Sequence, residues 1–307
     1  MSEAHIRQEM LRFARLCYER SLLVAMDGNL SALLPNGDVL CTKAGCHKGM
    51  LTDADLVVID RKGAKVRGQG DPTSEMAMHL ACYDARPDVR AVVHAHPPIS
   101  VAFTVAGVSM ARCVLPEVVL TLGTIPTLDY RTTGTEDLAG IVGRHIRSYD
   151  AMLMDRHGAV CVGRDLLEAF CRLETMEHTA LITKTARDMG QVLELPPEEA
   201  VHLRSMGLKR YGGPPSAVAR ADQPGADLPD VCLGCSGCAN PSPTGIGPAP
   251  TGSRLDLRMA RVAVQPLMTL GQAMTEAGRH IAAPDPVPTS PLEDTIVSEV
   301  LQALKDA

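Results

Sequence analysis

The chain has 307 residues, of which 45% are hydrophobic and 21% are charged, and its formal net charge is -6. This composition is typical of a soluble protein with one large core and room for appendages. The mildly acidic balance and the scattered Lys and Arg residues argue against nucleic-acid binding. No stretch is apolar enough to span a bilayer, and Glu3, Glu9 and Glu19 interrupt the first helix-like segment, so neither a membrane span nor a secretory signal is expected.

The first 212 residues alternate helix-like and strand-like segments. Apolar residues at a helical period, from Ile6 to Cys17, predict an opening helix at about 3–22. Strands are expected at 29–34, 38–42, 56–60, 89–96, 151–155 and 159–162, and further helices at about 73–85 and 165–190. Strands grouped with flanking helices predict an α/β fold, with three α/β/α layers around a central mixed or antiparallel sheet.

The composition changes near residue 212, and we therefore assign the folded domain to 1–212. Residues 213–253 are dense in Gly, Pro and Ser and predict a flexible linker. Residues 254–282 are helix-prone. Residues 283–307 contain a further linker and then, at 291–307, a short amphipathic helix with acidic residues in its first turn.

Ten cysteines are present, and seven of them lie in segments that look like core elements. Such thiols stay reduced in the cytosol, so we expect a cytoplasmic protein. The other three, Cys232, Cys235 and Cys238, form a CxxCxxC cluster in the linker. Bacterial ferredoxin spacing would place a fourth cysteine at position 242, where Ser242 stands. An iron–sulfur cluster or a second metal at these cysteines, and a simple thiol-rich linker, both stay open.

Three histidines at strand ends suggest a metal site. Residues 91–98 read AVVHAHPP, and because side chains alternate along a strand, His94 and His96 would point to one face. His157 ends another apolar run and is followed by Gly158, which would let the backbone turn away. A catalytic zinc commonly takes three protein ligands and leaves one position open, so this set predicts one Zn²⁺ per subunit. A structural role for the HxH pair is the alternative.

Glu75, in DPTSEMAMHL, is the candidate acidic group beside the histidines. Thr73 or Ser74 can cap the helix that follows, and Glu75 would fall in its first turn, where the helix dipole favours negative charge. A plain capping role is the alternative. His79, one turn further along, is expected to be a surface or packing histidine.

Three short segments could together hold an anion. AMDGNLS and CTKAGCHKG contain tight turns beside strands, and PTSE precedes a helix. Together they resemble a phosphate cradle built from backbone amides and small side chains, although each alone is more often just a turn. The residues concerned are Gly28, Asn29, Thr42, Lys43, Ala44, Gly45, Thr73 and Ser74.

These motifs occur together in one known family. The sequence resembles the class II aldolase/adducin family over about residues 5–212, and within it the sugar-phosphate aldolases of the L-fuculose-phosphate type. The motifs that carry the resemblance, in order and spacing, are GN (28–29), TKAG (42–45), PTSE (72–75), HAH (94–96), GT-x-x-L (134–138) and RHG (156–158).

The resemblance implies a class II aldolase that needs zinc and forms no Schiff base. Such an enzyme cleaves a (deoxy)ketose 1-phosphate, such as L-fuculose 1-phosphate or L-rhamnulose 1-phosphate, to dihydroxyacetone phosphate and an aldehyde such as lactaldehyde. A homotetramer is implied as well. An epimerase or dehydratase working through the same metal-stabilised enediolate is an alternative, as is a non-catalytic adducin-like interaction module, against which the intact histidines and Glu75 argue.

The resemblance also assigns residues. His94, His96 and His157 match the zinc ligands, and Glu75 matches the catalytic acid/base, which also approaches the metal. Tyr211 matches a tyrosine that assists the active site. The positions that match the phosphate-holding residues are Gly28, Asn29, Ala44, Gly45, Thr73 and Ser74.

Two positions depart from the family pattern. Leu115 falls at or near the place of a tyrosine that serves as proton donor to the leaving aldehyde, and Glu117 is the nearest polar group there. Ala44 replaces a hydroxyl residue of the phosphate loop, which Lys43 or Thr42 could offset.

The terminal helix at 291–307 resembles an encapsulation peptide, the kind of tail that directs enzymes to the shell proteins of bacterial microcompartments. Enclosure would suit a reaction that releases a reactive aldehyde. A helix that folds back onto its own domain, or that supports oligomer contacts, is the alternative.

Overall fold

The computed structural model describes residues 2–215. The strands are β1 (Asn29–Leu33), β2 (Val39–Thr42), β3 (Leu56–Ile59), β4 (Lys65–Arg67), β5 (Ala91–Ala95), β6 (Thr127–Leu128), β7 (Ala151–Met154) and β8 (Gly158–Gly163). The helices are α1 (Glu3–Glu19), α2 (Met76–Ala85), α3 (Pro98–Val105), α4 (Pro116–Thr121), α5 (Glu136–His145), α6 (Leu166–Met189) and α7 (Pro197–Tyr211), with 3-10 turns η1 (Lys48–Met50) and η2 (Asp53–Asp55). The CxxCxxC cluster and the expected helix at 291–307 lie outside the described residues.

All the strands described belong to one sheet, in the order β4-β3-β2-β1-β5-β8-β7-β6. Neighbouring strands are antiparallel except β6 and β7, which are parallel. The sheet is therefore mixed and mainly antiparallel, as predicted.

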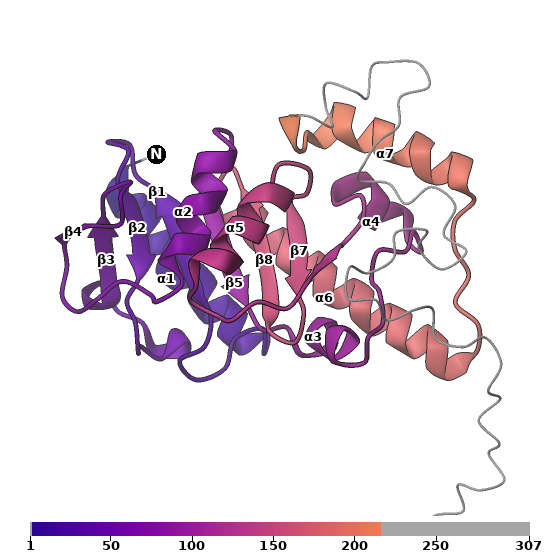
Figure 1. Ribbon diagram of the computed structural model, residues 1–307, viewed down its shortest axis with the longest axis horizontal. Helices are drawn as coiled ribbons and strands as arrows, with labels where there is room; N and C mark the ends of the chain where they lie inside the picture. The colour runs from indigo at the N-terminus through magenta and orange to yellow at the C-terminus, as the bar shows by residue number, and fades with distance from the viewer. Residues whose placement is uncertain (1, 216–307) are drawn as a thin grey trace, which may run out of the picture. The chain divides into compact units, whose positions relative to one another are not determined.

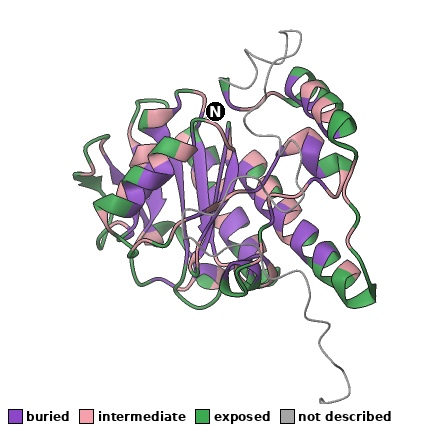
Figure 2. Ribbon diagram, turned by 45° about the vertical axis from the view of Figure 1, so that its right-hand side comes forward, coloured by how far each residue is buried: buried purple, intermediate pink, exposed green. Residues whose placement is uncertain are grey.

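Helices cover both faces of this sheet (Figure 1). The helices α1, α3 and α6 bury their apolar sides against one face, and α2 and α5 against the other. Strand β5 shows how alternation feeds both cores: Ala91 and Val93 face the first, and Val92 faces the second. Figure 2 shows the buried strands between helices whose outer sides are exposed. The three-layer prediction is confirmed.

Several elements were not expected from the sequence. One is helix α3: β5 ends at Ala95, and Pro98 occupies the first turn of α3, a position where its fixed φ suits a helix. Helix α2 begins at Met76 rather than at residue 73, and neither Thr73 nor Ser74 caps it. Glu75 itself stands at the N-cap position, and its side chain makes no capping hydrogen bond.

The seven cysteines within residues 2–215 are free thiols, and all but Cys171 are buried. Burial raises the pKa of Cys17, Cys41 and Cys82 to about 12, so these thiols are neutral packing groups. In the same part of the chain, no helix combines the length and the apolar character that crossing a membrane requires.

Candidate metal centre and active site

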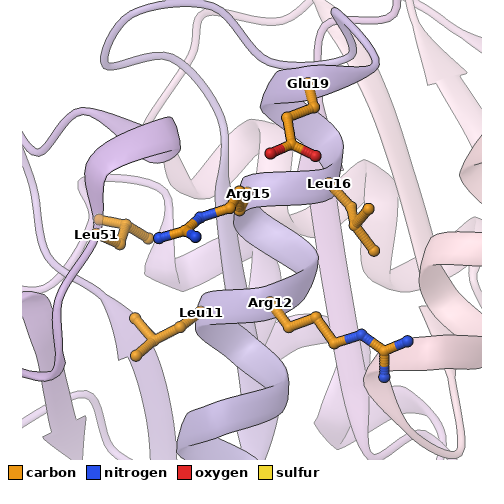
Figure 3. Close-up of a pocket in the computed structure, with 6 residues that line it drawn as sticks. All are labelled: Leu11, Arg12, Arg15, Leu16, Glu19 and Leu51. Atoms are coloured by element: carbon orange, nitrogen blue, oxygen red, sulfur yellow. The ribbon is translucent and has the colours of Figure 1, made fainter.

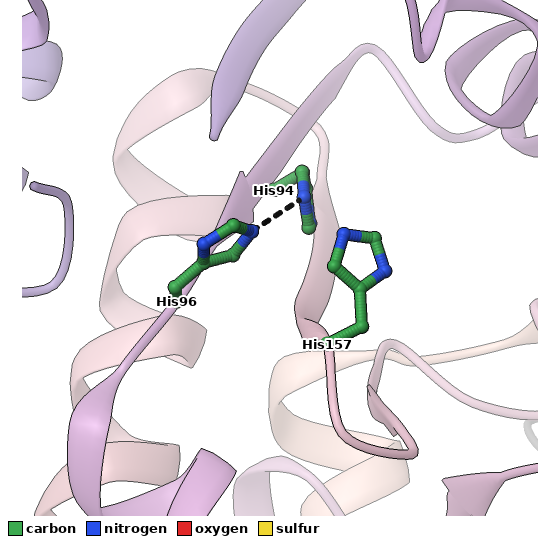
Figure 4. A group of neighbouring side chains, drawn as sticks. All are labelled: His94, His96 and His157. Carbon is green, nitrogen blue, oxygen red and sulfur yellow. Dashed lines mark hydrogen bonds between the residues drawn. The ribbon is translucent and has the colours of Figure 1, made fainter. Parts of the chain in front are cut away.

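The three candidate histidines meet at one end of β5 and β8 (Figure 4). His94 lies in β5, His96 follows that strand, and His157 lies in the turn that joins β7 to β8. Because β5 and β8 are paired, the two segments end side by side. The Nε2 atoms of His94 and His96 are 3.1 Å apart, and the three histidines offer ligand nitrogens within 4.8 Å of one another.

Close packing beneath the rings explains the glycine that follows His157. A Cβ atom on Gly158 would stand 2.5 Å from the Ala95 carbonyl oxygen, 2.6 Å from His96 Cδ2 and 3.0 Å from His94 Cε1. The backbone turn itself is made by Arg156, whose φ is 53°. Gly158 is therefore needed for space under the histidines and not for the turn that the sequence suggested.

Glu75 reaches the same point from the start of α2. Its Oε2 lies 3.0 Å from His94 Nε2, and its Oε1 lies 3.3 Å from His157 Nε2. Asn29 Nδ2 donates a hydrogen bond to Oε2 at 2.9 Å. Burial alone would raise the pKa of Glu75, but His157, His94 and Asn29 outweigh it and hold that pKa well below its usual range. Glu75 is thus an ionised carboxylate.

The donor atoms fit a divalent cation. The carbonyl oxygen of Ala159 lies 2.9 Å from His94 Nδ1, and if this nitrogen carries the ring proton, the lone pair of His94 Nε2 faces the Glu75 carboxylate. In that tautomer a cation is the group that would satisfy both atoms, whereas without one His94 Nε2 donates to the carboxylate and helps to hold the pKa of Glu75 low. Nitrogens on a tetrahedral zinc lie roughly 3.3 Å apart, near the separation of His94 and His96. Burial, together with repulsion from His94 and His157, lowers the pKa of His96 to about 3, which keeps its imidazole in the neutral form that binds metals.

A buried hydrogen-bond chain leads away from the carboxylate. Because Asn29 donates through Nδ2 to Glu75, its Oδ1 accepts from His79 Nε2 at 2.5 Å. His79 Nδ1 must then accept from Ser31 Oγ at 2.7 Å, and Ser31 Oγ in turn accepts from the Tyr83 hydroxyl at 2.7 Å. Burial lowers the pKa of His79 to about 3, so its ring is neutral, as this chain requires.

The role of His79 could have been found in the sequence. Glu75, His79 and Tyr83 are spaced four residues apart, which places them on one face of a helix. His79 was expected to be a surface or packing residue; it is fully buried, and its contacts also orient the Asn29 amide.

The structure brings the three predicted anion-binding segments together. An isolated bridge joins Lys43 to Pro72, and Ala44 N donates to Asp71 O at 2.9 Å, so the TKAG loop runs beside the PTSE segment. Gly28 has a φ of +65°, and a Cβ there would lie 2.7 Å from the His94 carbonyl oxygen, so only glycine fits. Gly28, Asn29 and Thr73 are buried, while Ala44, Gly45 and Ser74 are exposed.

Lys43 and Thr42 were expected to compensate for the hydroxyl that Ala44 lacks, but both side chains already have partners in the fold. Lys43 Nζ forms an ion pair with Asp55 at 2.5 Å. Thr42 is fully buried, and its Oγ1 accepts a hydrogen bond from Leu30 N. Both side chains are used within the fold.

Tyr211 does not join the histidines within this chain. It lies at the end of α7 and lines a hollow of about 430 Å³ together with Val89 and Gly163. Those two residues flank the other ends of β5 and β8, one strand length from the triad. Leu115 is the N-cap of α4, and Glu117 is exposed in its first turn.

A second hollow, of about 400 Å³, runs along the outer side of α1 (Figure 3). It is lined by leucine side chains and by Arg12, Arg15 and Glu19. It contains no residue of the histidine site.

Fold and site together define a three-layer α/β/α domain with a centre of three histidines and a carboxylate, of which His94 and Glu75 are buried, able to hold a metal. The Class II Aldolase and Adducin N-terminal domain family matches residues 8–183, more than half of the chain, and the chain belongs to this family. The resemblance noted in the sequence is thereby confirmed.

Two kinds of curated relatives are similar to this chain. It is 32% identical over 173 residues to an L-fuculose phosphate aldolase of Methanococcus maripaludis, covering 56% of this chain and 92% of that protein. It is also 32% identical over 182 residues to a 3-oxo-tetronate 4-phosphate decarboxylase of Escherichia coli K12, covering 58% and 85%. Both names describe enzymes that break carbon–carbon bonds in phosphorylated substrates.

Solved structures agree on the fold. YgbL of Klebsiella pneumoniae, described as an aldolase, epimerase or decarboxylase, has a TM-score of 0.63 and 30% identity, covering 66% of this chain and all of its own.

Proposed function

We propose that this chain is a metal-dependent lyase that breaks the bond between the α and β carbons of a phosphorylated ketone and leaves the enediolate of dihydroxyacetone phosphate. The observation that carries the proposal is the Glu75 carboxylate, ionised and buried, 3.0 Å from His94 and 3.3 Å from His157. A general base beside a cation site is the arrangement that forming and quenching an enediolate requires.

The histidines, Glu75 and Asn29 would have different roles in this reaction. A divalent metal on His94, His96 and His157 would act as a Lewis acid for the negative charge that develops on the substrate oxygens. Glu75 carries the proton to and from the α carbon. Asn29 fixes Oε2 of this carboxylate, whereas Oε1, which lies 3.3 Å from His157 Nε2, is the oxygen left to exchange the proton.

The leading substrate is a (deoxy)ketose 1-phosphate, such as L-fuculose 1-phosphate or L-rhamnulose 1-phosphate. Aldol cleavage of either gives dihydroxyacetone phosphate and lactaldehyde. The similarity to L-fuculose phosphate aldolases over almost their whole length supports this choice.

Decarboxylation is the second candidate, and Leu115 favours it. In aldol cleavage the hydroxyl on the β carbon loses a proton as the aldehyde forms, so the residue at the place of the family's tyrosine has to take a proton in this direction and donates it only in the reverse reaction. Leu115, at or near that place, offers no group to take the proton. A 3-oxo-tetronate 4-phosphate loses carbon dioxide from a carboxylate that is already ionised. The same enediolate of dihydroxyacetone phosphate results, and the decarboxylase relative is as similar as the aldolase.

One set of assays separates the two. The zinc-loaded full-length chain is incubated with each ketose phosphate and with 3-oxo-tetronate 4-phosphate, and dihydroxyacetone phosphate, lactaldehyde and carbon dioxide are measured. Aldehyde in equal amount to dihydroxyacetone phosphate supports the leading candidate, and carbon dioxide supports the second. No dihydroxyacetone phosphate from any substrate rejects both and favours an epimerase or dehydratase.

A homotetramer would give Tyr211 a place in the reaction. Because Tyr211 lies by the far ends of β5 and β8 in its own chain, only the partner subunit's Tyr211 could reach a given triad. Mixing inactive Tyr211→Phe and Glu75→Gln subunits should restore part of the activity if sites are shared. No recovery from mixed oligomers would reject this arrangement.

Packaging in a microcompartment is proposed from the sequence of 291–307 alone. A fluorescent protein fused to residues 285–307 should move to shells in a shell-forming host, and diffuse fluorescence would count against it.

A further inference from the structure

Lys48 is a buried cation between two of the loops around the site. It is 2% exposed, although lysine is almost never fully buried without a partner. Its ammonium donates to Met26 O at 2.8 Å and to Cys46 O at 2.9 Å. The first carbonyl lies two residues before Gly28, and the second lies directly after Gly45.

The ammonium has hydrogen bonds but no counter-ion. Within residues 2–215 it forms no ion pair with a carboxylate, and its neighbours are the two backbone carbonyls and the Cys46 side chain. Burial lowers the pKa of Lys48, while Cys46, Asp27 and Glu75 act in the opposite direction. A buried cation that lacks an anion is costly unless a ligand supplies one.

The surroundings indicate which ligand that is. The loops that Lys48 joins are two of the three segments that form the proposed phosphate cradle, and Lys43, the cation expected there from the sequence, is already paired with Asp55. We propose that the Lys48 ammonium is the positive charge that binds the phosphate group of the substrate. This inference rests on the proposed function for the identity of the substrate, but not for the binding of phosphate.

The inference makes Lys48 a binding residue as well as a tether between loops. A tether needs only hydrogen-bond donors, which glutamine also has. A phosphate site needs the charge, because hydrogen bonds that involve an ionised group are the stronger ones. Lys48→Gln therefore separates the two roles, and Lys48→Met removes both.

The test is the Kd of inorganic phosphate for the zinc-loaded full-length chain, measured by titration calorimetry. Lys48→Gln and Lys48→Met should both bind phosphate about 10- to 100-fold more weakly, which corresponds to about 1.4 to 2.8 kcal/mol. Lys65→Met is the matched control, because Lys65 also donates to a carbonyl, that of Gly70 at 2.9 Å, but is well exposed. It should bind phosphate as the wild type does.

Three results would overturn the inference. Wild-type affinity in Lys48→Gln would make Lys48 a tether only. Equal phosphate affinity in every variant would mean that phosphate binds elsewhere, and no phosphate binding by the wild type would mean that the chain has no such site. If the Lys48 variants do not fold, a crystal structure of the wild type with phosphate decides, because the ammonium must then contact a phosphate oxygen.

Failure of the proposed function would look different. If phosphate binding depends on Lys48 but the substrate assays give no dihydroxyacetone phosphate, the proposed lyase reaction is rejected and the phosphate site at Lys48 is supported.

Discussion

His79 links the buried polar chain to the catalytic carboxylate, and replacing it tests that link. His79→Leu keeps an apolar side chain of similar size but removes two buried hydrogen bonds, at 2.5 Å to Asn29 and at 2.7 Å to Ser31. Each partner left unsatisfied in the interior costs about 1–3 kcal/mol, so the free energy of unfolding should fall by roughly 2–6 kcal/mol.

The same change should slow the reaction. Without His79 the Asn29 amide is free to turn, and Glu75 loses the hydrogen bond that fixes Oε2. A hydrogen bond to a charged group contributes about 1.5–3 kcal/mol, so we expect kcat to fall about 10- to 100-fold. Release of dihydroxyacetone phosphate at saturating zinc measures kcat, and urea unfolding measures stability.

The matched control is Tyr83→Phe. It removes only the outermost hydrogen bond of the chain, 2.7 Å from Tyr83 to Ser31, so it should cost about 1 kcal/mol and leave most of kcat. His79→Gln can still donate to Asn29 and should recover part of the loss. A His79→Leu variant that is less stable but has the kcat of the wild type would refute the positioning role.

Three further predictions concern pH, packing and metal content. The pKa of His79 is lowered to about 3 in the fold, against about 6.5 in the unfolded chain. Its contribution to stability is therefore complete above pH 6.5 and is lost as the pH falls towards 3, by up to about 1.4 kcal/mol per pH unit. In His79→Gln the free energy of unfolding should depend less on pH over this range, and a pH dependence equal to that of the wild type would contradict the burial argument. Gly158→Ala should weaken zinc binding and cost about 1–3 kcal/mol through overpacking. Gly140→Ala in α5, whose added Cβ would make only an ordinary contact with Arg144 at 3.7 Å, should be neutral or stabilising in the same thermal melts. Metal analysis should find about one zinc per chain in the wild type, lost in His96→Ala and kept in Cys235→Ser; loss in the cysteine variant instead would move the metal to the linker.

The sequence was informative wherever a local pattern decides the structure. The apolar runs at 89–96 and 159–162 predicted the strands beside the histidines, and the pairing of these two strands, β5 and β8, brings His94, His96 and His157 together. Helix α5 was missed because Gly140 and Gly143 lower its helix propensity. In the fold, Gly143 is useful: a Cβ there would stand 3.3 Å from Ala81, so α5 packs closely on α2.

What the sequence could not show depends on contacts between distant segments. Asn29 and His79 are 50 residues apart, and nothing local to either predicts their hydrogen bond. Lys48, in CHKG, has the sequence context of a surface turn, and only the folding of loop 24–28 over it buries the ammonium. Strand β4 has exposed side chains throughout and so lacks the alternation that reveals a strand.

Hydrogen exchange into dihydroxyacetone phosphate tests the central claim most directly, because it requires neither an aldehyde nor carbon dioxide. The zinc-loaded chain in deuterium oxide should place one deuterium on the hydroxymethyl carbon of dihydroxyacetone phosphate, as followed by proton NMR, and Glu75→Gln prepared in the same way should not. Absence of exchange in the folded, zinc-loaded wild type would contradict an enediolate formed beside Glu75, and so the account as a whole.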